Sequence, residues 1–305
     1  MCGTSTRNSL TLGAALGLLA AVAAFAMAPA SFDEATRSRA AAQSSAPVDE
    51  VVARVSARVG EYFRRAESIV CLERVMVQQI RSDLTPIGFA RVLEYELRVA
   101  WEKPNDGDKP EATVLRQLKR INGREARPGA EPQCLDPRAV SPEPLALLLP
   151  SNREDYVFSV TGAGRDRNRA ALILAYKSRV EGKPTVTTKD DCTNVDLPGW
   201  TKGRLWLDPA THDVLRFEES LTKRFDYRVP SREIRFGMPD SWTLDRADTS
   251  IRYRPVDFTD PEETVLLPES IESLVIFRGP GVVGHRTVQT FSGYKRFVTA
   301  GRLVK

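Results

Sequence analysis

The chain has 305 residues, of which 42% are hydrophobic and 28% are charged, and its formal net charge at pH 7 is +4. Acidic and basic residues are spread along the chain without a basic block, which argues against a nucleic-acid-binding surface. No apolar run beyond the N-terminal region approaches the length of a membrane span.

The N-terminal region predicts export. Arg7 is the only charged residue in residues 1–30, and an apolar run over residues 10–27 is followed by small residues. Small-x-small patterns ending at Ala28 and Ala30 fit signal peptidase sites, so we predict a signal peptide cleaved near one of them. An uncleaved membrane anchor is the alternative, because the run approaches spanning length. Either way, the protein is expected to be periplasmic or secreted.

The next elements in chain order are a linker and a helix. Residues 31–47 are small, polar and aperiodic, which predicts a flexible linker, and residues 48–305 are expected to form one domain. In "VDEVVARVSARVGEYFRRAESI", apolar residues recur at steps of three and four from Val48 to Ala66. This spacing predicts an amphipathic helix, and its valines lower the intrinsic helix propensity, so it needs a surface to pack on.

The rest of the chain is mostly β. In residues 93–102, apolar residues alternate with charged ones, which predicts a strand with one dry and one wet face. Asn122-Gly123 is a strong turn signal. Because the strand segments are consecutive and many turns are short, we expect an antiparallel meander. Further strand segments are "SIVCLERVMV", "DYVFSVTG", "RAALILAYKSRV", "RADTSIRYRPVDF", "ESIESLVIFRG" and "HRTVQTFSGYKRF".

One short helix interrupts the strands. "SPEPLALLLPSNREDY" begins with a Ser cap and early prolines, and its leucines gather before Pro150. It is too apolar to lie free in water, so it should cover the dry face of the sheet. It could act there as a lid or as a crossover helix that fills the core.

Three cysteines follow the apolar run. An odd count in an oxidising compartment implies one disulfide and one spare thiol. Cys134 and Cys192 lie in polar, loop-like segments, whereas Cys71 begins a strand pattern, where buried thiols are common. We therefore predict a Cys134–Cys192 disulfide and a reduced, buried Cys71. Zinc is the rival interpretation, although no pair has the short spacing of a zinc site.

The segment "GRLWLDPATHDVLRFEESL" contains Asp208, His212 and Asp213 close together. They could mark a metal or acid–base site, or the tip of a hairpin. Asp208 can accept backbone N–H bonds and Pro209 pre-sets φ, both of which suit a turn. A metal site would need another ligand from far away, and the only other histidine is His285. We interpret the cluster as a turn, with no catalytic residue and no metal.

The flanking strands of this hairpin should each have a dry face. Leu205 and Leu207 share one face of the first strand. In the second strand, we expect Leu215 and Phe217 on one face and Val214 on the other.

Together these features resemble the LolA/LolB lipoprotein-carrier superfamily and the related domain of the sigma-factor regulator RseB. "GRLWLDPATHDVLRFE" looks like a hairpin of that superfamily, and "VLLPESIESLVIF" resembles a later strand entered through Leu-Pro. "RTVQTFSGYKRFVT" is similar to the last strand of uncharacterised exported proteins of an Acidobacteria-type branch. The resemblance implies an α+β fold: a strongly curved antiparallel β-sheet, or unclosed barrel, with an N-terminal amphipathic helix and a short lid helix on its concave face.

The same resemblance implies a ligand site on the concave face. A curved sheet that its helices cannot fill leaves an apolar cavity, the usual form of a ligand site. We expect a non-enzymatic periplasmic carrier or sensor without a cofactor, which binds a lipid or lipoprotein acyl chain or an apolar peptide, and which can have an envelope protein partner. The alternatives are a structural or protein-interaction module with a filled core, and a hydrolase or metal-binding enzyme. The expected lining residues are Leu97, Val99, Trp101, Leu145, Leu148, Leu172, Leu174, Leu205, Leu207 and Phe277.

Overall fold

The computed structural model of the chain describes residues 48–66, 69–102, 111–127, 143–189, 192–228, 241–279 and 284–296. Every described residue belongs to one compact unit, Ser45–Lys305. The predicted signal peptide, the predicted linker and Cys134 lie outside the described residues and stay predictions. None of the described helices combines the length and the apolar character that crossing a membrane requires.

Helix α2, Val48–Arg65, is the first described element. Asp49 and Glu50 lie in its first turn and Arg64 and Arg65 in its last, an arrangement that the helix dipole favours. Its buried stripe confirms the amphipathic helix that the spacing predicted. The residues of this stripe are Val51, Val52, Val55, Ser56, Val59 and Phe63.

Most of the remaining described residues form one twelve-stranded antiparallel sheet. Its strands are β1 (Ile69–Ile80), β2 (Pro86–Glu102), β3 (Glu111–Ile121), β4 (Arg124–Glu125), β5 (Tyr156–Asp166), β6 (Arg169–Ser178), β9 (Thr201–Leu207), β10 (Val214–Leu221), β11 (Phe225–Arg228), β12 (Ser241–Thr259), β13 (Glu262–Arg278) and β14 (Gly284–Arg296). A separate two-stranded sheet pairs β7 (Thr185–Lys189) with β8 (Cys192–Asp196).

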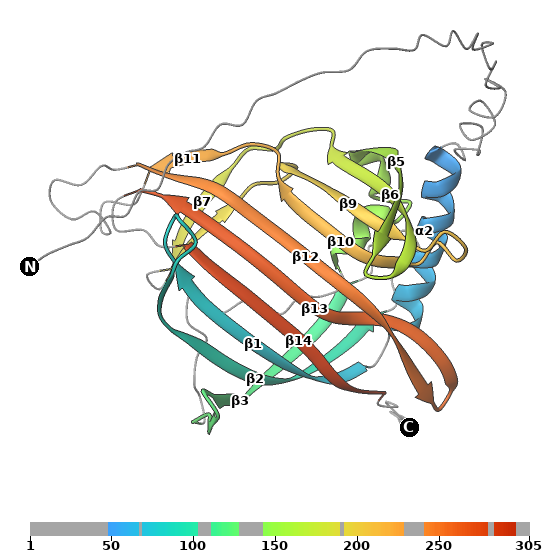
Figure 1. Ribbon diagram of the computed structural model, residues 1–305, viewed down its shortest axis with the longest axis horizontal. Helices are drawn as coiled ribbons and strands as arrows, with labels where there is room; N and C mark the ends of the chain where they lie inside the picture. Colours follow the sequence, from blue (N-terminus) through green and yellow to red (C-terminus); the bar gives the residue numbers. More distant parts are fainter. Residues whose placement is uncertain are drawn as a thin grey trace, which may run out of the picture. The chain divides into compact units, whose positions relative to one another are not determined.

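The strand order corrects the expected meander. Across the sheet the order is β4-β3-β2-β1-β14-β13-β12-β10-β9-β6-β5, with β11 on β12, so the first strand pairs with the last. Both β1 and β14 alternate buried and less buried residues, and matching dry faces favour this long-range pair. Figure 1 shows β1, β14, β13 and β12 side by side. Within the described residues β4 and β5 do not pair with each other, so the sheet is open, which confirms the predicted unclosed fold.

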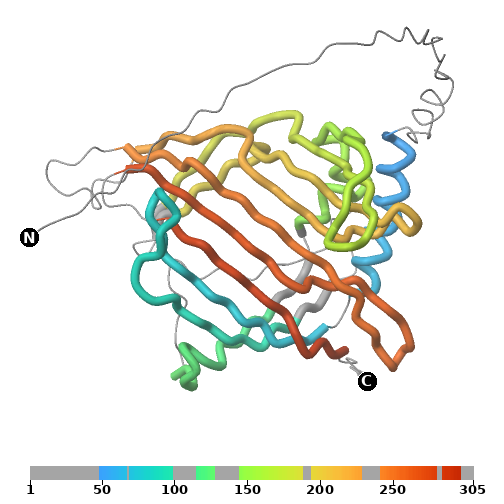
Figure 2. The backbone as a smooth tube through the Cα atoms, viewed as in Figure 1, coloured from blue at the N-terminus to red at the C-terminus, as the bar shows by residue number. Residues whose placement is uncertain are grey.

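The helices cover one face of this sheet, which we call the inner face. A short 3-10 helix, η1 (Glu143–Leu148), shares a buried cluster with α2 and the sheet, and a second, η2 (Arg153–Asp155), leads into β5. The short apolar helix that the sequence predicted is therefore present and packs where it was expected. Figure 2 follows the same path, with α2 in blue and the C-terminal strands in red. The buried leucines of η1 are Leu145, Leu147 and Leu148, and Leu149 follows them.

Candidate functional site

The cluster at Asp208 is a turn, as the sequence indicated. One oxygen of the Asp208 carboxylate, Oδ1, accepts the N–H groups of Ala210 (2.9 Å) and Thr211 (3.1 Å), and the Asp208 carbonyl accepts the N–H of His212 (2.9 Å). His212 has a left-handed φ of 61° and completes the bend between β9 and β10. In the described part of the chain, no three His, Cys, Asp or Glu side chains are grouped so that they could hold a metal ion.

The second strand of this hairpin departs from the expected alternation. Val214 pairs with Leu207, but the register shifts before Arg216, so β10 contains a bulge. Val214 and Phe217 both lie in the inner cluster, whereas Leu215 packs with Trp206 on the opposite, outer face. The prediction that Leu215 and Phe217 share a face was wrong, because one extra residue moves the following side chains to the other side.

Most of the expected lining residues meet under the two helices. We call this group the inner cluster. Its predicted members are at most 4% exposed, and Leu172 packs against them with partial burial. They are Leu97, Leu145, Leu148, Leu174, Leu205 and Leu207.

The other three predicted lining residues are not among the described members of the inner cluster. Phe277 is not part of the inner cluster: it lies six residues along β13 from Ile271, about 20 Å away in an extended strand. The side chains of Val99 and Trp101 lie outside the described residues. Sequence reasoning also missed aromatic members of the cluster, namely Tyr176, Tyr253 and Phe291.

The centre of the inner face is filled, and a hollow of about 450 Å³ lies at its edge between α2 and β5, bordered by Val48, Val52, Tyr156 and Phe158 among others. The hollow beneath α2 and η1 has a volume of about 30 Å³ and is bordered by Val59, Leu145, Val214 and Tyr253 among others. That is about the space of one water molecule. In the described residues, α2 and η1 thus occupy the position that an apolar ligand would take.

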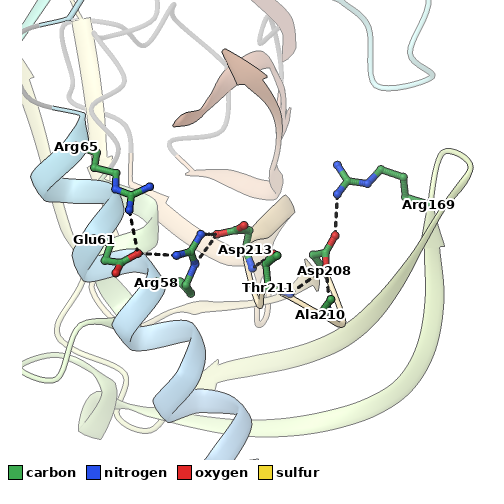
Figure 3. Close-up of polar contacts among 8 residues, drawn as sticks. All are labelled: Arg58, Glu61, Arg65, Arg169, Asp208, Ala210, Thr211 and Asp213. Carbon is green, nitrogen blue, oxygen red and sulfur yellow. Dashed lines mark hydrogen bonds and ion pairs between the residues drawn. The ribbon is translucent and has the colours of Figure 1, made fainter. Parts of the chain in front are cut away.

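Polar contacts fix α2 against the tip of the β9–β10 hairpin (Figure 3). Arg58 donates to Asp213 through Nε (2.8 Å) and lies 2.5 Å from Glu61 on its own helix. Across the hairpin, Arg169 on β6 donates to Asp208 at 2.7 Å. These pairs line a cleft of about 330 Å³, and their opposite charges compensate one another.

The C-terminal end of α2 has a second anchor. Arg296 of β14 donates to the main-chain carbonyl of Arg65 at 2.5 Å, and its guanidinium lies 4.8 Å from the centre of the Phe258 ring. A cation at the last turn of a helix satisfies a free carbonyl and suits the dipole. Both contacts that hold α2, with Asp213 beside β10 and with Arg296 on β14, therefore come from segments far away in the sequence.

A partly buried carboxyl borders the inner cluster. The Tyr176 hydroxyl donates to Glu219 at 2.9 Å, and the Tyr176 ring stacks on Phe217 with centroids 5.9 Å apart. Burial raises the pKa of Glu219, and the hydrogen bonds from Tyr176 and Thr201 oppose this rise. Burial, reinforced by the Glu219 carboxyl, also raises the pKa of Tyr176. The hydroxyl supplies the partner that a buried acceptor requires.

The outer face has a much larger hollow, which we call the outer groove. Its volume is about 740 Å³, and it crosses β9, β10, β12, β13 and β14. Ion pairs line it: Arg204 to Glu218 at 3.0 Å, Arg246 to Asp248 at 2.9 Å and Arg286 to Glu272 at 2.9 Å. The groove therefore presents alternating charge on a curved surface.

Comparisons with known proteins found similar solved structures. No protein-family model matches the chain, and no curated protein matches it. A domain assigned to outer membrane lipoprotein sorting, from Vibrio parahaemolyticus, is similar at 10% identity, over 80% of this chain and 93% of that chain, with a TM-score of 0.37. A LolA superfamily protein from Nitrosomonas europaea is similar at 10% identity over 82% and 94% of the two chains, with a TM-score of 0.32. A DUF1329 family protein from Desulfovibrio piger is similar at 10% identity over 83% and 94%, with a TM-score of 0.36. The Acidobacteria-type branch stays a prediction.

Proposed function

We propose that the protein is a non-enzymatic, periplasmic binding module that holds a protein partner on its surface, with a filled core. The filled inner face carries this proposal. The hollow of about 30 Å³ beneath α2 and η1 is far too small for an acyl chain, and the hollow of about 450 Å³ between α2 and β5 has Arg153, Glu154 and Arg179 in its lining. The outer groove measures about 740 Å³. Of the functions that the sequence left open, the interaction module fits this geometry best.

The chemistry of the outer groove supports a protein as the ligand. An acyl chain in the groove would take water from the Arg246–Asp248 and Arg286–Glu272 pairs and return no hydrogen bonds, which is costly. A protein surface of mixed charge can instead pair with both signs. Such complementarity governs partner choice and the rate of association more than affinity itself.

Charge reversal in the groove tests the proposal. We expect Asp248→Arg and Arg286→Glu to lower, at least severalfold, the recovery of a discrete partner cross-linked to the protein in its own envelope. The matched control is Arg98→Glu on β2, which breaks an exposed pair with Glu96 outside the groove. Equal recovery from the groove variants, the control and the wild type would contradict the proposal.

A second candidate is the carrier or sensor of an acyl chain or other apolar ligand. The observation that favours it is the large apolar cluster on the inner face, to which α2 contributes mainly valines. Burying an acyl chain of about 16 carbons would contribute about 13 kcal/mol at about 0.8 kcal/mol per CH₂. The five apolar residues of the α2 stripe contribute about 10 kcal/mol at about 2 kcal/mol each. The two values are close, so an acyl chain in place of the helix would bury a comparable apolar surface.

Native mass spectrometry separates the two candidates. The carrier predicts a lipid-sized adduct on protein purified from its own envelope, and uptake of an apolar dye that Val55→Asp increases by loosening α2. The interaction module predicts neither the adduct nor dye uptake by the wild type.

A further inference from the structure

Two lysines face each other on the outer side of the sheet. Strands β6 and β9 are neighbours (Figure 1), and Lys177 on β6 pairs directly with Lys202 on β9. Tyr176 lies in the inner cluster, so the next residue along β6, Lys177, points to the outer face. Both lysines are exposed, and within the described residues neither forms an ion pair. Like charges directly opposite each other on neighbouring strands destabilise a sheet.

The two arginines beside these lysines share a single carboxylate. Arg204, two residues from Lys202 on the same face of β9, donates to Glu218 at 3.0 Å, and Arg216 of β10 binds the other oxygen of Glu218. Trp206 is 6% exposed, and the centre of its ring lies 5.1 Å from the Arg204 guanidinium and 4.7 Å from that of Arg216. Stacking on this ring holds both guanidinium groups in place.

The other carboxylates near this end of the outer groove are already engaged. Glu219 accepts the Tyr176 hydroxyl on the inner side. The rest have basic partners of their own: Glu181 binds Lys223, Asp248 binds Arg246 and Asp245 binds Arg224.

The result is a local excess of positive charge, which we call the basic patch. It consists of Lys177, Lys202, Arg204 and Arg216, and among the described residues Glu218 alone pairs with it. Four bases and one acid leave a net charge of +3. Lys202, Arg204 and Glu218 line the outer groove, so the patch forms one end of it.

We propose that the basic patch binds an acidic, extended segment of the protein partner that occupies the outer groove. This inference rests on the proposed function and names the chemistry of the partner. Carboxylates of the segment pair with Lys177 and Lys202 and so remove the repulsion between them. They also accept hydrogen bonds from the donors of Arg204 that Glu218 leaves free, since this side chain is 57% exposed.

The spacing of the charges favours an extended peptide over a single phosphate group. Lys202 and Arg204 are two residues apart on β9, which is about 7 Å along a strand and equals the distance between alternate side chains of an extended peptide. A segment with Asp or Glu at alternate positions therefore meets both. A single phosphate is held best by donors that converge on one point, as in a nest of backbone N–H groups, whereas these side chains project from a strand side by side.

Fluorescence anisotropy with a labelled peptide, (Glu-Thr)5, tests the patch on protein purified from its own envelope. We expect Lys202→Glu to weaken binding at least about fivefold at low salt. The matched control is Lys295→Glu, which changes the charge equally at an exposed lysine of β14 outside the groove, and should leave the affinity unchanged. The Tm of Lys202→Glu should not fall, because the change replaces a like-charge pair by an opposite-charge pair, so unfolding does not explain the lost affinity.

Three results would overturn the inference. The first is no binding of (Glu-Thr)5, and the second is equal affinity in the wild type and in Lys202→Glu. The third is displacement of the peptide by inorganic phosphate but not by chloride at the same ionic strength, which would make the patch a phosphate site.

The proposed function and this inference fail separately. If Asp248→Arg and Arg286→Glu leave partner recovery unchanged while the peptide result holds, the proposed function fails and the patch remains a site for acidic peptides. If partner recovery falls in those variants but Lys202→Glu changes neither partner recovery nor peptide affinity, the inference fails alone.

Discussion

Removing Arg116 gives the sharpest test of how the sheet is held together. Glu73 on β1 is 2% exposed, and the Arg116 guanidinium from β3 binds both its oxygens at 2.8 Å. Gln289 from β14 donates to the same carboxylate at 2.8 Å, and the Tyr95 ring lies 3.7 Å from the Arg116 guanidinium. The network thus joins β14, β1, β2 and β3, including the pairing of the first strand with the last.

Arg116→Met removes the charge and keeps much of the side chain's length, leaving Glu73 buried with one remaining partner. Breaking a buried pair in this way costs about 3–5 kcal/mol. For a domain of this size that corresponds to a fall in Tm of roughly 6–20 °C. The matched control is Arg286→Met, which breaks the pair with Glu272, whose side chains are 56% and 50% exposed. Exposed pairs contribute about 0–1 kcal/mol.

Urea unfolding of both variants measures the difference. The double variant Glu73→Leu, Arg116→Leu should recover part of the loss, because apolar side chains can replace a buried pair beside Val75 and Leu93, while Gln289 loses its partner. If Arg116→Met costs no more than the control, or if the double variant is as unstable as the single one, the assignment of a desolvated ion pair is refuted.

Three further outcomes are expected. Peptide mapping without reductant should recover Cys134 linked to Cys192, while Cys71 reacts with alkylating agents only after unfolding, because burial raises the pKa of its thiol to about 12. Burial lowers the pKa of His285, so the unfolded chain takes up a proton at higher pH than the folded protein does, and the free energy of unfolding falls as pH drops from about 7 to 5. His285→Gln should remove that part of the fall in a pH series of unfolding curves. Gly203→Ala should destabilise the protein by about 1–3 kcal/mol or more in the same assay, because the new Cβ would meet a backbone carbonyl of β10 and an aromatic ring of β6. Unchanged stability would show that this contact relaxes freely.

Patterns local in sequence predicted the local structure well. The three- and four-residue spacing located α2, and the Asn122-Gly123 signal located the β3–β4 turn, where both residues have positive φ. The turn at Asp208 followed from its hydrogen-bonding capacity and from Pro209 beside it. In each case the cause lies within a few residues, so the sequence contains it directly.

Features that depend on distant partners were not predictable in the same way. Alternation cannot show the bulge before Arg216, because only the pairing with β9 defines the register. The pairing of β1 with β14 depends on matching faces at opposite ends of the domain. The filled inner face depends on volumes: the sequence indicated which side chains are apolar, but not that α2 and the leucines of η1 leave only about 30 Å³.

The strength of the contacts that hold α2 bears on both candidate functions. The Arg58–Asp213 pair is 36% and 22% exposed, so it contributes about 1 kcal/mol at most. The bond from Arg296 to the Arg65 carbonyl contributes a similar amount. The apolar stripe contributes several times more, so the polar contacts orient the helix and the stripe holds it. Arg58→Ala should therefore leave the inner face closed, and only a ligand that replaces the buried apolar surface of the stripe could open it. A partner in the outer groove needs no such exchange, because its site is open while α2 stays in place.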